Sequence, residues 1–182
     1  MKRNYNGPLT LAQLKEASIK SFNNAIELLD DAEILFNSNR YARTLFLIRI
    51  SQEEFGKFLI VNETIIKSIH EENIDWPKFW QRLSKHEEKT YKYSSVVKEF
   101  FNKNIASFAD GNLNKAIPFW EYIKIACIYV DFHNESFRLP SEYISVELVA
   151  EAMESTKNII GSFIDFDIND VIDAAKMNLT KI

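Results

Sequence analysis

Helix-breaking residues are scarce along this chain, and their scarcity limits the folds that are open to it. The 182 residues include four glycines and four prolines, while 46 % of all residues are hydrophobic. All-β proteins need turn residues between many short strands, so few breakers favour long helices instead. The length suits one domain with a sizeable core. We therefore expect residues 1–182 to form a single all-α domain.

Helix-start signals and apolar stripes divide the chain into about five long helices. Thr10 and Gln13 have the spacing of a capping box, and Ser145 can cap the last long helix. Asp75 can cap a helix whose first turn holds Pro77. The predicted helices cover about 11–36, 40–69, 76–102, 118–129 and 146–163, with an irregular segment at 131–140 and a short amphipathic helix in the acidic tail. Because the loops are short, we expect an antiparallel bundle.

Several classes of protein do not fit this composition. The longest apolar stretches are shorter than a bilayer span, and the first ten residues lack the apolar core of a signal peptide. Cys127 is the only cysteine, which excludes an intramolecular disulfide and a cysteine-based metal cluster. No glycine-rich phosphate loop is present. We expect a cytoplasmic protein with no membrane contact, no metal site and no cofactor.

Charge is unevenly spread over a chain whose formal net charge is −4. Residues 78–103 carry seven Lys or Arg against three Glu, a net of +4. Residues 131–173 carry ten Asp or Glu against two basic residues, a net of −8. Such segments are usually solvated faces. Two alternatives stay open: the basic segment binds phosphate, or the two segments pair across a dimer.

The charged cluster EEFGK at residues 53–57 ends an apolar run, Thr44 to Ile50, inside the helix predicted over 40–69. With about 100° per residue, Arg49, Glu53 and Lys57 share one face, which predicts a ladder of ion pairs on the helix surface. Glu54 lies on the apolar arc, where a carboxylate is costly unless it is paired. A structural ion pair and a functional site are both consistent with Glu54.

Counting residues from the predicted turns brings polar groups from four helices to one level. At 1.5 Å per residue, Glu54 lies opposite His86 and Lys89. The complete predicted layer contains Asn24, Glu54, Lys57, His86, Lys89, Tyr129 and Asp131. A single His with a carboxylate is too small a set for a zinc or di-iron site.

His86 is the candidate proton-transfer group of this layer, because imidazole titrates near neutral pH. Lys89 and Arg82 can stabilise phosphate charge, and Glu54 can orient His86. These are the groups that a metal-independent ribonuclease needs. The same residues could instead form a buried charge network that sets the register of the helices.

Three segments of the chain resemble the AbiV family of abortive infection proteins. They are FNNAIELLDDAEILFNSNRYARTLFLIRISQEEFGK, WPKFWQRLSKHEEK and IKIACIYVDFHNESFRLP, in this order. The resemblance covers about residues 10–140 and leaves a C-terminal helix and acidic tail at 141–182. It implies a HEPN-like helical bundle, a homodimer, and a role in bacterial defence against phage through arrest of translation or RNA metabolism. Many HEPN proteins are metal-independent endoribonucleases.

The family pattern marks eight positions of this chain: Asn24, Glu53, Glu54, Lys57, His86, Lys89, Tyr129 and Asp131. The ribonuclease signature of HEPN proteins separates its Arg and His by more than the three residues between Arg82 and His86. Two functions therefore remain open. One is an RNA-cleaving enzyme, triggered by a phage-encoded activator. The other is a non-catalytic dimer that blocks translation by binding a phage or host protein.

Overall fold

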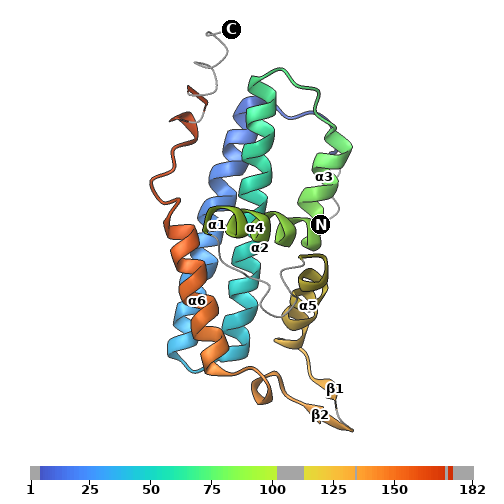
Figure 1. The fold of residues 1–182 in the computed structure, drawn as a ribbon, viewed down its shortest axis with the longest axis vertical. Helices are drawn as coiled ribbons and strands as arrows, with labels where there is room; N and C mark the ends of the chain where they lie inside the picture. Colours follow the sequence, from blue (N-terminus) through green and yellow to red (C-terminus); the bar gives the residue numbers. More distant parts are fainter. Residues whose placement is uncertain (1–4, 102–112, 134, 171, 174–182) are drawn as a thin grey trace.

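Two long antiparallel helices, α1 (Leu11–Asn37) and α2 (Tyr41–Ile69), form the axis of the molecule (Figure 1). The computed structural model describes residues 5–101, 113–133, 135–170 and 172–173. Thr10 and Gln13 form the predicted capping box at the start of α1. The turn between the helices has Asn39 at φ 57°, a left-handed conformation that Asn tolerates.

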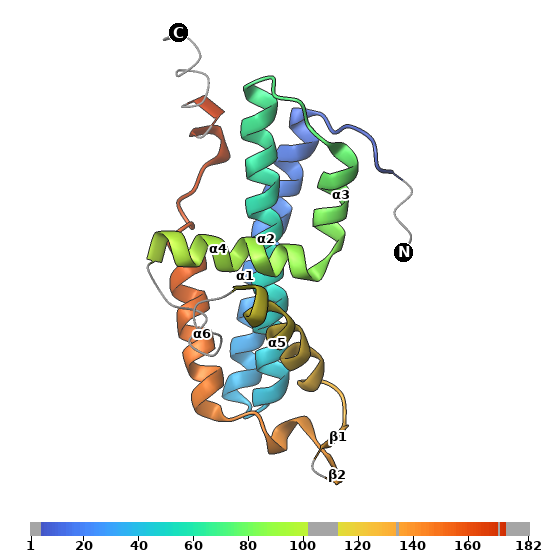
Figure 2. The same ribbon diagram turned by 45° about the vertical axis from the view of Figure 1, so that its right-hand side comes forward.

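Four shorter helices within the described residues surround this pair: α3 (Trp76–Ser84), α4 (His86–Phe101), α5 (Leu113–Ala126) and α6 (Val146–Gly161). Helix α6 runs beside one end of α1 and α2, and α4 crosses over α2 (Figure 2). The predicted caps of α3 and α6 are confirmed, because Asp75 accepts from the N–H of Lys78 and Ser145 from that of Leu148. The all-α bundle is thus confirmed.

The predicted irregular segment after α5 is wrong, because it folds into a small β-hairpin. Strands β1 (Asp131–His133) and β2 (Ser136–Arg138) pair antiparallel, with Asp131 opposite Arg138, and the 3₁₀ turn η1 (Pro140–Glu142) follows. In the acidic tail, 168–170 and 172–173 are helical, while 174–182 lie outside the described residues. Pro118 lies inside α5 rather than at its start.

The prediction of one helix over 76–102 is also wrong. Lys85 adopts an extended conformation and separates α3 from α4, and the predicted end at 102 lies outside the described residues. Two hydrophobic clusters explain the break. Phe79 of α3 packs into a cluster with Ile60 and Ile65 at one end of α2, whereas Val97 of α4 joins the main cluster around Phe55. The change of direction at Lys85 lets each helix bury its own apolar side.

The crossing of α4 over α2 requires a glycine. At Gly56, an added Cβ would lie 2.2 Å from the carbonyl oxygen of Lys89, much closer than two such atoms can approach. The absence of a side chain at Gly56 therefore lets the backbones of α2 and α4 touch. Because α4 crosses α2 instead of running antiparallel to it, levels counted from the turns do not apply to α4.

Candidate functional site

A buried carboxylate, Glu53, lies at the centre of the polar groups between α2, α4 and α5. Only 3 % of the residue is exposed. Its Oε2 is 2.5 Å from Nδ1 of His86 and 3.1 Å from Nζ of Lys89, and its Oε1 is 2.5 Å from Nζ of Lys124. Gly56, one helical turn away, allows the close approach that brings α4 to this carboxylate. Three basic groups from two other helices therefore converge on one glutamate.

The imidazole of His86 differs from the other partners of Glu53 because it reaches solvent. Its side chain is 59 % exposed, compared with 8 % for Lys89 and 6 % for Lys124. With Nδ1–H donating to the carboxylate, the ring is held in one tautomer, and Nε2 is the nitrogen that can accept a proton. This is a carboxylate–imidazole pair in which the carboxylate is buried and the imidazole is open to solvent.

Lys124 links this pair to a second carboxylate on its own helix. Its Nζ is 2.5 Å from Oε2 of Glu121, and Oε1 of Glu121 accepts a hydrogen bond of 3.1 Å from the hydroxyl of Thr90 on α4. Both buried ammonium groups are therefore paired, as buried charges must be. Ion pairs of Glu53 connect α2 to both α4 and α5, and the hydroxyl of Thr90 connects α4 to α5.

The pKa of Glu53 reflects two opposing effects. Burial by itself raises the pKa of this carboxyl group. The hydrogen bonds from Lys124 and His86, together with the charge of Lys89, more than offset burial and hold the pKa below its ordinary value. Glu53 is therefore ionised at neutral pH and can hold the imidazole in place.

Arg49 lies one turn before Glu53 and extends the polar network toward α6. Its guanidinium donates to Gln52 and lies 4.7 Å from the ring centroid of Trp120, and Gln52 donates to Thr156 over 2.7 Å. Burial lowers the pKa of Arg49. Burial likewise raises the pKa of Tyr93, beside Thr156 and Gln52, to about 12.

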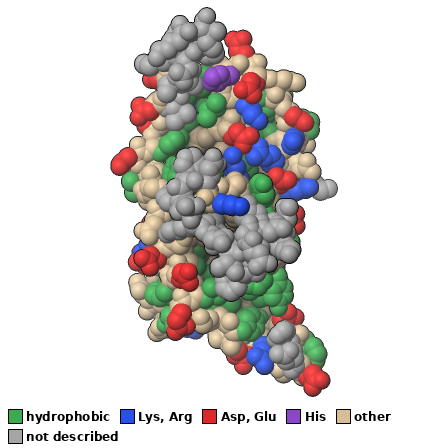
Figure 3. All heavy atoms as spheres, in the orientation of Figure 1, with side chains coloured by type: hydrophobic (Ala, Val, Ile, Leu, Met, Phe, Trp, Pro, Cys, Tyr) green, Lys and Arg blue, Asp and Glu red, His purple; other side chains and the backbone are tan. Residues whose placement is uncertain are grey.

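A second ion cluster surrounds Glu63, farther along α2. Arg82 donates to both of its oxygens at 3.4 and 3.1 Å, and the ammonium groups of Lys92 and Lys67 lie 3.1 Å away. Although partial burial raises the pKa of Glu63, these hydrogen bonds and the charge of Lys92 lower it to about 2. Figure 3 shows Lys, Arg, Asp and Glu side chains gathered on this part of the surface. The structure thus places Arg82 on Glu63, while His86 contacts Glu53.

Two predictions about the EEFGK cluster are wrong. Glu54 is not the partner of His86, because it pairs with Lys57 at 2.5 Å along the side of α2. The predicted ladder of Arg49, Glu53 and Lys57 does not form, since these side chains have the other partners described above. The physical reason is that α2 is enclosed on most sides, so its charged face is as buried as its apolar one.

Three other members of the predicted layer lie outside the cluster. Asn24 and Tyr129 are exposed, and the carboxylate of Asp131 accepts from the N–H of Phe132 in the hairpin. The sequence reasoning missed Lys124 and Glu121. These two charges, three residues apart in the otherwise apolar stretch IPFWEYIKIACIYV, were the available signal.

The protein is a helical bundle of the HEPN class, with a buried carboxylate that collects basic side chains. The family model for AbiV matches residues 13–161, and the chain therefore belongs to the AbiV family. Neither the curated proteins nor the solved structures gave a match.

Within the described residues, no three His, Cys, Asp or Glu side chains converge as a metal ion would require. None of the described helices combines the length and the apolar character needed to cross a bilayer.

Proposed function

We propose that this protein acts in abortive-infection defence against phage by cleaving RNA without a metal ion. Membership of the AbiV family supports the defence role. The observation that carries the enzymatic part is the exposed imidazole of His86, held through Nδ1 by the buried carboxylate of Glu53. Glu53 takes the positioning role that the sequence suggested for Glu54.

The proposed reaction starts with proton transfer to Nε2 of His86 from a ribose 2′-hydroxyl. The 2′ oxygen then forms a bond to the adjacent phosphorus, and the bond from phosphorus to the 5′ oxygen breaks. The 5′ oxygen leaves with a proton from the solvent or the imidazolium. The products are a 2′,3′-cyclic phosphate and a 5′-hydroxyl end.

The buried charges behind the pair favour a phosphate substrate, whereas Glu87 and Glu88 follow His86 at the start of α4. Among the buried and partly buried groups of the network, Glu53 and Glu121 are outnumbered by the cations of Arg49, Lys89 and Lys124, which leaves that network with an excess of positive charge. Such an excess attracts phosphate and stabilises charge that builds up on it. Lys89 serves mainly to keep Glu53 ionised. Arg82 is still proposed as a phosphate contact, for which its guanidinium would have to leave its ion pair with Glu63.

The proposal includes the other partners that the sequence suggested. The protein acts as a homodimer in the bacterial cytoplasm, and a phage-encoded protein triggers it. Exposed hydrophobic side chains on α5 and the hairpin offer a surface for self-association (Figure 3).

A phage plaque assay with inspection of total RNA tests the proposal in cells. We expect wild-type protein to reduce plaque formation and to cause RNA breakdown after infection, and we expect His86→Ala to lose both effects. His70→Ala is the matched control, because His70 is exposed at the end of α2, away from Glu53. Full protection by a stably folded His86→Ala variant would refute the enzymatic proposal.

A non-catalytic role is the second candidate, and the β-hairpin favours it. Phe137 is 77 % exposed and packs edge-on against Phe132 of the facing strand, which gives the hairpin an exposed aromatic pair suited to binding a protein. If this role is correct, Phe137→Ser abolishes protection while His86→Ala retains it. Ile34→Ser, at an exposed apolar position on α1, is the control for lost surface hydrophobicity.

A further inference from the structure

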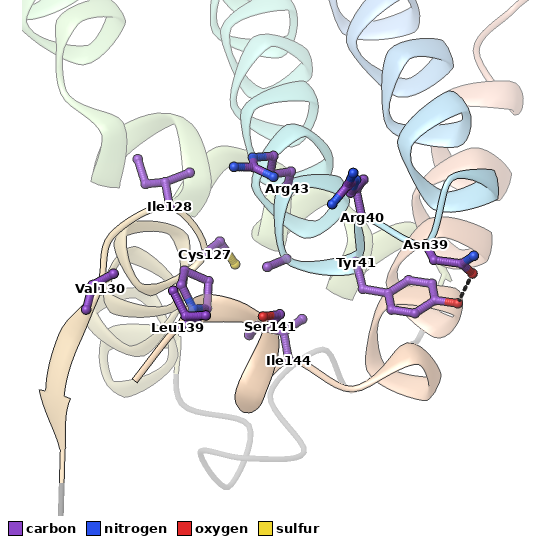
Figure 4. Close-up of a pocket in the computed structure, with 12 residues that line it drawn as sticks. Asn39, Arg40, Tyr41, Arg43, Cys127, Ile128, Val130, Leu139, Ser141 and Ile144 are labelled. Atoms are coloured by element: carbon purple, nitrogen blue, oxygen red, sulfur yellow. Dashed lines mark hydrogen bonds between the residues drawn. The ribbon is translucent and has the colours of Figure 1, made fainter. Parts of the chain in front are cut away.

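A pocket of about 420 Å³ lies between the start of α2, the end of α5 and η1 (Figure 4). Its volume falls in the range of small-molecule sites in proteins. The start of α2 supplies one wall, and the segments after α5 and around η1 supply the others. Arg43 lies ten residues before Glu53 on α2, or about 15 Å along the helix axis. The pocket is therefore separate from the His86 cluster.

Two arginines stand on the α2 side of this pocket. Arg40 and Arg43 are exposed, and among the described residues neither forms an ion pair with a carboxylate. Glu142, next to the pocket residue Ser141, accepts a hydrogen bond from the backbone N–H of Leu139 and forms no ion pair with either arginine. The hydroxyl of Tyr41 donates to Asn39 over 2.6 Å and points away from the arginines (Figure 4). Two guanidinium groups of the pocket are thus left without an ion pair to any carboxylate among the described residues.

The opposite wall of the pocket is apolar. Ile128, Val130 and Leu139 are 39 %, 55 % and 55 % exposed, while Cys127 and Ile144 are buried behind them. Figure 4 shows Val130, Leu139 and Ile144 on the side of the pocket away from Arg40 and Arg43, with Ile128 drawn nearer to Arg43 and the Ser141 hydroxyl between Leu139 and Ile144. Three apolar side chains at a pocket mouth favour a ligand that removes them from water.

We propose that this pocket binds a small organic anion, whose anionic head contacts Arg40 and Arg43 and whose apolar body packs on Ile128, Val130 and Leu139. Guanidinium groups bind carboxylates and phosphates alike through paired N–H donors. The anionic head of the ligand can therefore be either a carboxylate or a phosphate. The anionic head gives orientation and the apolar body gives affinity. The inference does not depend on RNA cleavage at His86.

Isothermal titration calorimetry of the full-length protein tests the proposal with four probes: phenyl phosphate, hexanoate, inorganic phosphate and benzyl alcohol. We expect at least one organic anion to bind roughly tenfold or more tightly than inorganic phosphate and benzyl alcohol. Binding of phenyl phosphate alone identifies a phosphate ester as the head, and binding of hexanoate alone identifies a carboxylate.

Four variants place the binding in this pocket. Arg40→Gln and Arg43→Gln should each weaken binding roughly tenfold, because each removes a charged hydrogen-bond donor. Ser141→Trp should abolish binding by filling the pocket from an exposed position, with the fold checked by circular dichroism. Lys20→Gln is the control, since this exposed lysine on α1 lies outside the pocket. The proposal is overturned if neither organic anion binds better than inorganic phosphate, or if folded Arg43→Gln and Ser141→Trp bind like the wild type.

Discussion

Adjacent glutamates, Glu53 and Glu54, have different roles in this protein. Glu53 is buried and binds three basic groups, whereas Glu54 forms an ion pair with Lys57 on the partly exposed side of α2. The helical wheel assigned the buried position to Glu54, because it identifies the apolar side of a helix. A helical wheel cannot show that another helix covers the polar side of a helix. Glu53 lies on such a side, because α4 crosses α2 there.

The two glutamates should therefore differ in their contribution to stability. Glu53→Gln leaves the buried ammonium group of Lys89 without a carboxylate, and Lys124 keeps only its pair with Glu121. We expect a loss of about 3 kcal/mol in the free energy of unfolding. Glu54→Gln removes a partly solvated pair and should cost less than about 1 kcal/mol. Urea unfolding of both variants measures the difference. Equal losses would contradict the buried role of Glu53.

Glu63 should make stability depend on pH in the acidic range. Its pKa is about 2 in the folded protein, below the ordinary value of 4.5. A carboxyl group whose folded pKa is lowered stabilises the fold above the unfolded pKa, and this stabilisation is lost as the pH falls through 4.5 toward 2. Wild type should therefore be more stable than Glu63→Gln at pH 6, and their difference in unfolding free energy should shrink toward pH 2. A difference that stays constant on acidification would contradict the lowered pKa.

At the scale of the elements, the crossing of α4 over α2 builds the candidate site. Helix α4 starts with His86 and passes Gly56 at Lys89, so both contacts with Glu53 come from its first two turns. The caps at Thr10, Asp75 and Ser145 could be predicted because they depend on neighbours in sequence. The break at Lys85 could not, because it depends on which hydrophobic cluster each half of the segment joins.

Gly56→Ala tests the importance of this crossing. The new methyl group would lie 2.2 Å from the carbonyl oxygen of Lys89, so α4 must move away from α2. We expect a loss of about 2 kcal/mol or more in thermal or urea unfolding, together with loss of RNA cleavage. Gly161→Ala is the matched control: no atom lies within 4 Å of its added Cβ, and its effect should stay within about 0.5 kcal/mol. If the two variants are equally stable, the close contact is not needed.

At the scale of the whole molecule, the all-α class could be predicted from the small number of helix-breaking residues. Which apolar side chains remain exposed on the surface could not be predicted. The outer side of α5 and the hairpin carries several exposed aromatic and aliphatic side chains, among them Tyr122, Ile125 and Phe132. An apolar pattern in a sequence predicts that side chains are buried, but it does not show whether the same chain or a second molecule buries them.

We expect this surface to mediate the proposed self-association. Phe132→Ser with Phe137→Ser removes two exposed aromatic rings that contact each other, and should shift the protein from dimer to monomer in sedimentation velocity experiments. Ile34→Ser on α1 should leave the dimer intact. A wild-type monomer, or a dimer that persists in the double variant, would contradict this interface.

The most direct test of the account is RNA cleavage by protein purified from phage-infected cells, with a metal chelator present. Wild-type protein should cleave RNA and leave 2′,3′-cyclic phosphate ends. We expect His86→Ala to lower the rate of cleavage roughly a hundredfold or more. Glu53→Gln should also lower the rate, because the imidazole loses the carboxylate that orients it. Absence of cleavage by wild type, or an equal rate for a folded His86→Ala variant, would contradict the claim that His86 and Glu53 form a ribonuclease site.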